Sequence, residues 1–224
     1  MKVKVSDFIV DFLVKKKLHT VPVYQGGAVM NLIDSIGTNK NIKYFVPYHE
    51  QSLSMQVDTI SRLDGFGAGF VTSGPGATNL LTGVCSAFYD SIPCIYFAGQ
   101  VGQIHLKKNR KVRQLGFQES DVVKIFEPVT KYCKQINNAM DIKYELEKAF
   151  YLANSGRPGP ILFDIPFNIQ RTVVDKNKLR SFSTSSKNNN FKSKKKILKI
   201  FEFIKKSKKP LILVGGGVKR SKQE

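Results

Sequence analysis

The sequence of 224 residues has no tryptophan, three histidines, three cysteines, and 17 acidic against 36 basic residues. Three is an odd number of cysteines, and no pair among Cys85, Cys94 and Cys133 has the spacing of a redox or metal motif. We therefore expect reduced thiols in a cytoplasmic protein. No apolar run approaches the roughly 20 residues that a membrane-spanning helix needs. The charged, amphipathic start over 1–18 does not resemble a signal peptide, so the sequence predicts no membrane partner.

Acidic residues are scarcest near the C-terminal end. Of the net charge of +19, residues 176–224 contribute +14, because they hold 16 lysines and arginines against two acidic residues. Within this segment, residues 181–190 have almost nothing to bury and are typical of a linker. A basic tail can bind phosphate backbones non-specifically, but a solvated, lysine-rich linker and helix face is the simpler interpretation. We therefore predict no specific nucleic-acid partner.

Short apolar runs alternate with amphipathic segments through the first 170 residues. We expect strands over 21–24, 44–47, 70–71, 93–98, 129–133 and 160–165, and helices over 6–13, 30–36, 50–63, 77–89 and 142–154. Ser6 is the expected N-cap of the first helix. The alternation predicts an α/β fold, a doubly wound parallel sheet with helices on both faces. In such sheets ligands bind beyond the carboxyl ends of the strands.

A second unit is expected after the linker. The sequence predicts a helix over 197–204 and a buried strand over 211–214, followed by Gly215-Gly216-Gly217. A strand and glycine turn need further elements to cover them, so we expect an unfinished second α/β domain. The expected organisation is one domain over 1–172, a basic linker and helix over 173–208, and the start of a middle domain over 209–224.

Two local features could carry chemistry. The glycine-rich residues 72–79 lie between an expected strand and helix, where free N–H groups suggest a phosphate site. The segment lacks the Lys-Ser/Thr pair of a P-loop, and Asn79 stands where a dinucleotide fingerprint has its third glycine. Glu50 follows His49 at another junction, where a carboxylate commonly stabilises a helix start. Each feature alone is compatible with a purely structural role.

The order of the motifs is more specific than any one of them. They are Tyr24-Gln25-Gly26-Gly27, His49-Glu50-Gln51, residues 72–79, Asp90-Ser91-Ile92-Pro93, Gly99-Gln100-Val101, Phe117-Gln118-Glu119, Val129-Thr130-Lys131, residues 155–160 and Asp164-Ile165-Pro166. In this order, residues 1–172 resemble the N-terminal, pyrimidine-binding domain of thiamine diphosphate enzymes of the acetolactate synthase branch. Residues 209–217 resemble the start of the family's middle domain.

The resemblance implies a cofactor site and a reaction. In this family the glutamate that matches Glu50 bonds to N1′ of the aminopyrimidine and promotes loss of the thiazolium C2 proton. The cofactor then acts as electron sink while a 2-keto acid is decarboxylated and its carbanion is transferred to an acceptor. Glu50 is therefore the expected catalytic residue. The expected cofactor-binding residues are Tyr24, Glu50, Thr72, Gly74, Pro75, Gly76, Asn79 and Gln118, of which the last would face the reacting centre.

The sequence departs from the family pattern at several positions. Gln25 replaces a usual proline, and Thr59 stands where the family usually has glycine. The loop over 99–118 is longer and more basic than in ordinary acetolactate synthases, and it exceeds the usual strand–helix connection of about 2–6 residues. The keto acid and its acceptor are therefore left open.

The resemblance also implies parts that this sequence lacks. The family binds diphosphate and Mg²⁺ through a Gly-Asp-Gly…Asn motif in a C-terminal domain, and no such motif occurs here. We expect the chain alone to be inactive, and to need a homo-oligomer or a separate diphosphate-binding subunit; whether FAD binds stays open. The alternatives are an inactive, truncated relic or oligomerisation module of the same fold, and a basic nucleic-acid-binding protein, whose charge no motif accompanies.

Overall fold

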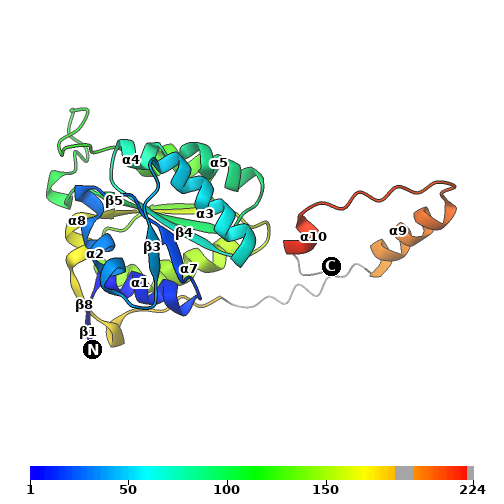
Figure 1. The fold of residues 1–224 in the computed structure, drawn as a ribbon, viewed down its shortest axis with the longest axis horizontal. Helices are drawn as coiled ribbons and strands as arrows, with labels where there is room; N and C mark the ends of the chain where they lie inside the picture. Colours follow the sequence, from blue (N-terminus) through cyan, green and yellow to red (C-terminus); the bar gives the residue numbers. More distant parts are fainter. Residues whose placement is uncertain (185–193, 221–224) are drawn as a thin grey trace. The chain divides into compact units, whose positions relative to one another are not determined.

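The computed structural model describes residues 1–184 and 194–220 (Figure 1). The chain divides into two compact units, Met1–Ser183 and Thr184–Glu224. The first unit contains the parallel sheet and the residues predicted to bind the cofactor. None of the helices in the described part of the chain has the length and apolar character needed to cross a bilayer.

A parallel sheet forms the centre of the first unit. Four strands lie in the order β4-β5-β7-β6. Their bounds are Gly67–Val71 for β4, Cys94–Gln100 for β5, Tyr132–Gln135 for β6 and Ile161–Pro166 for β7. A parallel pair, β2 (Thr20–Pro22) and β3 (Lys43–Phe45), joins this layer through a bridge between Val23 and Phe70. The predicted α/β fold with a parallel sheet is confirmed.

Helices cover both faces of the sheet (Figure 1). One face packs against α1 (Val5–Lys15), α2 (Met30–Thr38), α7 (Ile142–Asn154) and α8 (Phe167–Arg171). The other packs against α3 (Glu50–Asp64), α4 (Pro75–Thr78), α5 (Leu81–Tyr89) and α6 (Val122–Phe126). Short 3-10 turns complete the unit: Gly27–Val29, Gln103–His105, Glu127–Val129, Ala139–Asp141 and Lys176–Lys178.

The central strand β5 shows how the sequence specifies this layering. Ile95 and Phe97 point into the core on the α1 face, while Cys94, Tyr96 and Ala98 point into the core on the α3 face. Successive side chains of a strand point to opposite faces, so a strand covered on both faces is a nearly continuous apolar run. All seven residues of β5 are buried, and the polar Gln100 comes at the end of the run.

Several predicted elements differ from the structure. The single helix expected over 77–89 is divided into α4 and α5, because the Leu80 N–H bonds to Ala77 three residues back and tightens the chain. Helix α6 was not predicted. The strand expected over 129–133 lies further along the chain, as β6, since Pro128 lies within a 3-10 turn where that strand would begin.

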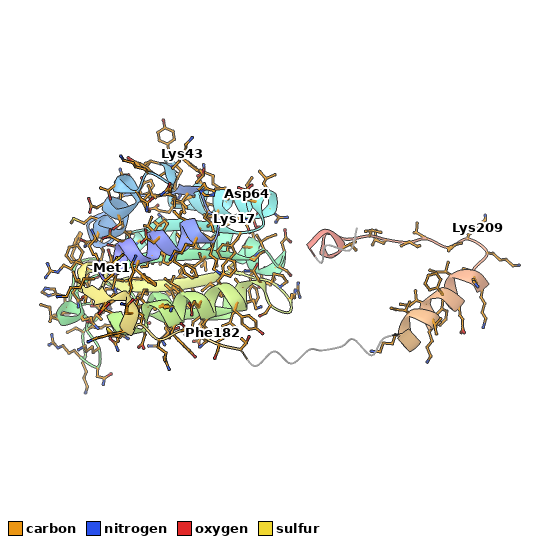
Figure 2. The ribbon with its side chains drawn as sticks, turned by 90° about the horizontal axis from the view of Figure 1, so that it is seen from below. Met1, Lys17, Lys43, Asp64, Phe182 and Lys209 are labelled. Atoms are coloured by element: carbon orange, nitrogen blue, oxygen red, sulfur yellow. The ribbon has the colours of Figure 1, made fainter. Side chains whose placement is uncertain are left out.

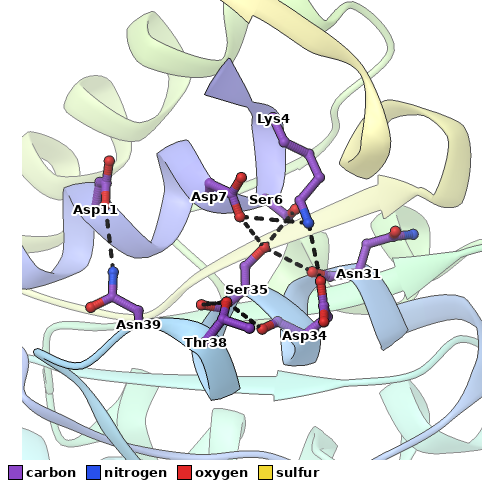
Figure 3. A network of polar contacts seen from close by, with 9 residues as sticks. All are labelled: Lys4, Ser6, Asp7, Asp11, Asn31, Asp34, Ser35, Thr38 and Asn39. Atoms are coloured by element: carbon purple, nitrogen blue, oxygen red, sulfur yellow. Dashed lines mark hydrogen bonds and ion pairs between the residues drawn. The ribbon is translucent and has the colours of Figure 1, made fainter. Parts of the chain in front are cut away.

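A polar seam joins α1 to α2 (Figure 3). The Ser35 hydroxyl donates to the Asp7 carboxylate at 2.6 Å and lies 2.8 Å from the Ser6 hydroxyl. The Lys4 ammonium lies 3.1 Å from Asp34 and 3.6 Å from Asp7. Ser6 was expected to cap α1, but the helix begins one residue earlier, and the buried Ser6 side chain contacts α2 instead.

The strands nearest the two ends of the first unit form a small antiparallel pair. Strand β1 (Lys2–Lys4) pairs with β8 (Val173–Asp175), so the unit extends past residue 172. Further along, the Phe182 ring packs against α7, at 5.4 Å from the Tyr144 ring (Figure 2). The polar composition of the expected linker over 181–190 did not indicate this aromatic contact. From residue 185 to 193 the chain lies outside the described residues.

The second unit contains α9 (Lys194–Lys206) and α10 (Gly217–Arg220). The buried strand expected over 211–214 is wrong for this structure. These four residues have no regular structure, and their side chains are 67–96% exposed. A strand satisfies its backbone through a neighbouring strand, and the described part of this unit has none. The helix expected over 197–204 is confirmed and is longer.

Two glycine substitutions test the packing. Gly83 on α5 faces α3, and a Cβ there would lie 2.1 Å from the Ser54 hydroxyl. We expect Gly83→Ala to lower the free energy of unfolding of the full chain by about 1–3 kcal/mol, because the two helices must separate. Urea unfolding measures the change.

The matched control is Gly37→Ala, inside α2, where a Cβ would meet no atom within 4 Å. This substitution should raise the free energy of unfolding by roughly 0.5–1 kcal/mol, because alanine has the higher helix propensity. Equal effects of the two substitutions would contradict the close approach of α3 and α5.

Candidate functional site

A cavity lies beyond the carboxyl ends of the parallel strands. Its volume is about 710 Å³, within the range of ligand clefts. Residues that end or directly follow β4, β5 and β7 line it, among them Thr72, Gln100 and Phe167. The topology explains this position, because the carboxyl ends of parallel strands meet at one edge of the sheet.

Glu50 is the first residue of α3, but it is not the residue that caps the helix. The His49 imidazole Nδ1 accepts the Gln51 N–H at 3.1 Å and fills the N-cap role. The Glu50 side chain is only 7% exposed, and its Oε2 accepts a hydrogen bond from the Asn79 amide at 2.9 Å. Within the described residues no cation forms an ion pair with it. A carboxylate buried without a cation is costly unless it is hydrogen-bonded, and Asn79 supplies that hydrogen bond here.

Glycines let the chain close around Glu50. A Cβ on Gly76 would lie 2.6 Å from the Thr72 methyl group and 3.3 Å from Glu50 Oε1. Gly74 has a φ of +58°, and a Cβ there would lie 2.5 Å from the Gln118 carbonyl oxygen. Glycine is the residue that tolerates both the left-handed conformation and such approaches. Residues 72–79 are therefore shaped by close packing.

The structure brings most of the predicted site residues together. Asn79 bonds to Glu50, and Gly76 separates Thr72 from the Glu50 carboxylate. Thr72 and Gln118 line the cavity, whereas Glu50 and Asn79 do not. The remaining members lie beside them: Tyr24 donates from its hydroxyl to the Tyr48 carbonyl at 3.4 Å, and Pro75 begins α4. Their roles stay a prediction.

Sequence reasoning assigned no role to Glu119, which organises the loop before it. The buried Glu119 carboxylate accepts N–H groups from Lys107 at 2.6 Å, Leu115 at 2.7 Å and Gly116 at 3.3 Å. Gln118, its neighbour, has a φ of +58°, which is uncommon outside glycine. The available signal was the Phe117-Gln118-Glu119 motif, but that motif does not indicate that the carboxylate binds backbone N–H groups 3, 4 and 12 residues before it.

Asp164 is a second buried carboxylate without an assigned role. Its Oδ2 accepts amide hydrogen bonds from Gln100 at 3.2 Å and Gln135 at 2.7 Å, and Gln100 also donates to the Ser120 carbonyl at 3.0 Å. Its Oδ1 is buried and has no hydrogen-bond partner within the described part of the chain. Burial raises the pKa of Asp164 to about 7, although both glutamines oppose the shift. This network ties β5, β6 and β7 to the segment that follows Gln118.

A family model described as "Thiamine pyrophosphate enzyme, N-terminal TPP binding domain" matches residues 3–125, more than half of the chain. The chain belongs to the thiamine pyrophosphate enzymes. This membership confirms the resemblance found in the motif order. The matched residues include β2 to β5. They also include Glu50 and the residues around it, Thr72, Gly76 and Asn79, which we call the Glu50 cluster. The domain that binds thiamine pyrophosphate in this family therefore contains the candidate site.

Acetolactate synthases are among the curated relatives of this thiamine pyrophosphate domain. The large subunit from Lactococcus lactis subsp. lactis (strain IL1403) is 36% identical over 200 residues, which cover 88% of this chain and 34% of the relative. The acetolactate synthase isozyme 3 large subunit of Escherichia coli (strain K12) is 36% identical over 219 residues, which cover 95% of this chain and 37% of the relative. Acetolactate synthase 2, chloroplastic, of Nicotiana tabacum is 34% identical over 225 residues, which cover 99% of this chain and 33% of the relative. The chain spans about a third of the length of these relatives.

The contacts around Glu50 are consistent with the aminopyrimidine site that the motif order predicts. The glycine at position 76 keeps the space beside Glu50 Oε1 open, where a Cβ would intrude. Asn79 holds only the other carboxylate oxygen, so Oε1 is available for a ring nitrogen. Within residues 1–184 and 194–220, no three His, Cys, Asp or Glu side chains are grouped so that they could hold a metal ion.

The raised pKa of Asp164 predicts a pH dependence of stability. The folded-state pKa lies above the ordinary value of 3.8, so folding favours the protonated form. The stabilisation is therefore fully present below about pH 4 and is lost as the pH rises to about 7. Relative to Asp164→Asn, the unfolding free energy of the native chain should fall by on the order of 4 kcal/mol over this range.

Urea unfolding of both proteins at several pH values measures this difference. Asp64→Asn is the control, because Asp64 is exposed at the end of α3; it should follow the native chain at every pH. Parallel stability curves for the native chain and Asp164→Asn between pH 4 and pH 7 would show that Asp164 is not the titrating group.

Proposed function

We propose that this domain binds the aminopyrimidine end of thiamine diphosphate and forms part of an acetolactate synthase-like enzyme. Such an enzyme decarboxylates a 2-keto acid and transfers the carbanion to an acceptor. The observation that carries the proposal is the Glu50 carboxylate, which is buried, relieved of capping by His49 and held on one oxygen by Asn79. The names of the relatives support the same reaction.

Each residue of the cluster has a defined task in this proposal. Glu50 Oε1 exchanges a proton with ring nitrogen N1′, in a buried setting where the hydrogen bond is strong. Asn79 fixes the orientation of the carboxylate by its bond to Oε2. The further cofactor contacts come from Tyr24, Thr72, Gly74, Pro75 and Gly76. When bound, thiamine diphosphate supplies the electron sink that decarboxylation requires.

Gln118 connects the Glu50 cluster to the cavity. Its side chain lines the cavity, while its backbone carbonyl lies against Gly74. A 2-keto acid in the cavity would therefore meet Gln118 on its way to the cofactor. Glu119 and the Asp164 network hold the segment on either side of Gln118 in place, so they act as positioning residues in this proposal.

We further propose that the diphosphate and Mg²⁺ bind to a separate domain, in a longer polypeptide, a second copy or another subunit. Residues 209–224 are proposed as the start of a middle domain. In support, the side chains of residues 211–214 are largely exposed, and α9 exposes Ile197, Phe201 and Phe203. Apolar surface of this kind is normally covered by a partner. The three free cysteines support a reducing, cytoplasmic compartment.

Glu50→Gln tests the catalytic role. In the assembly of this chain with a diphosphate-binding domain, the exchange rate of the cofactor C2 proton, followed by NMR, should fall by at least about 10²-fold. The melting temperature should be unchanged or higher, because glutamine can still accept from Asn79 without a buried charge.

The control for this test is Glu127→Gln, since Glu127 is exposed after α6 and should leave the exchange rate unchanged. Equal exchange in Glu50→Gln and the native protein would reject the proposal. It would favour an inactive module of the same fold instead.

The isolated chain should bind thiamine diphosphate weakly. We propose the described residues as a site for the aminopyrimidine; among them, no three His, Cys, Asp or Glu side chains are grouped to hold the metal of a bound diphosphate. Thiamine and thiamine diphosphate should therefore bind with similar dissociation constants, weaker than about 1 μM, and Mg²⁺ should have little effect. Calorimetry that gives tight, Mg²⁺-dependent binding of thiamine diphosphate alone would contradict this prediction.

A further inference from the structure

A basic loop is continuous along the chain with residues that line the cavity. Between Val101 and Gln118 there is no acidic residue, and the segment carries five strong cations. They are Lys107, Lys108, Arg110, Lys111 and Arg113. None of the five forms an ion pair within the described residues, although Lys4, Lys134 and Lys176 elsewhere do. The loop projects as the green segment at the left of Figure 1.

The base of this loop is closed by a single carboxylate. Glu119 accepts the N–H of Lys107 through Oε1 and that of Leu115 through Oε2, so both ends of the loop are held at one point. The Lys107 ammonium also donates to the Arg113 carbonyl at 3.2 Å across the loop. Because the Glu119 charge is used on backbone donors, it does not pair with the cationic side chains. The two ends of the loop are therefore fixed by hydrogen bonds, and its cationic side chains remain available to a ligand.

The neighbouring cavity has the same sign of charge. Its lining includes Arg171 and His105 but neither aspartate nor glutamate. The Arg171 guanidinium lies over the Phe167 ring at 5.8 Å and has no carboxylate partner within the described residues. The cavity residues Gln103–His105 precede the five cations in the sequence, and the cavity residues Phe117 and Gln118 follow them. One continuous segment thus supplies both part of the cavity wall and the five cations.

We propose that this cavity and loop bind a substrate or acceptor that carries a phosphate group. Its carbon chain lies in the cavity, against Ile104, Phe117 and Phe167, and its phosphate contacts the loop cations and Arg171. The inference rests on the proposed function, since it names the class of molecule that this enzyme uses. A cavity of about 710 Å³ exceeds the needs of a small 2-keto acid. Lysine and arginine clusters are the usual partners of phosphate.

Equilibrium binding of sn-glycerol 3-phosphate to the full chain tests the proposal without thiamine or turnover. The probe is chemically inert and joins a phosphate to a short carbon chain. ³¹P NMR and calorimetry should show saturable binding that weakens with salt. Inorganic phosphate should bind less tightly, and glycerol should not bind.

The decisive variant is Lys108→Gln/Arg110→Gln/Lys111→Gln, which removes three exposed loop cations. It should bind sn-glycerol 3-phosphate at least about tenfold more weakly. The matched control, Lys15→Gln/Lys40→Gln/Lys43→Gln, removes the same charge from exposed positions in α1, before β3 and in β3, and should change affinity less than about twofold. Arg171→Gln, with the loop intact, should weaken binding by about threefold or more.

Three results would overturn the proposal. They are the absence of saturable binding, an equal loss of affinity in the control triple variant, and equal affinities for inorganic phosphate and sn-glycerol 3-phosphate. An oligonucleotide that binds through the loop when the small probe does not would overturn it as well, in favour of nucleic-acid binding. Because none of these measurements involves the cofactor, they are independent of the Glu50→Gln experiment.

Discussion

Burial of β5 on both faces is the constraint on which the rest of the first unit depends. Its side chains alternate between two core clusters, so the helices of both layers are fixed relative to one strand. Parallel pairing with β4 and β7 then sets where those strands end. The residues that follow the three ends, Thr72, Val101 and Phe167, meet around one cavity as a result. The position of the site is therefore a consequence of core packing.

Three carboxylates are buried near this edge of the sheet, and each is satisfied differently. Glu50 receives one side-chain amide, Asp164 receives two, and Glu119 receives backbone N–H groups. None of the three is paired with a cation within the described residues. Backbone N–H groups and side-chain amides satisfy the buried carboxylates, and the lysine and arginine side chains remain at the surface. The cationic surface around the cavity follows from this separation.

Local patterns predicted the elements whose signal lies within the element. The apolar stripe of α7 gave both of its ends correctly, and the alternation of strands and helices gave the fold class. The residues alone suggested phosphate for 72–79 and a capping role for Glu50, whereas the order of the motifs predicts an aminopyrimidine site for both. The close approach of Gln118 to Gly74 and the Asp164 network depend on contacts between distant segments, which no local pattern contains.

The antiparallel pairing of β1 with β8 has an evolutionary consequence. Lys2 lies opposite Asp175, so the strands nearest the two ends of the first unit lie side by side. A domain built in this way can be inserted into, or removed from, a longer gene product while the flanking segments are rejoined over a short distance. Recombination can thus reassort such a module among multidomain proteins without disturbing its sheet.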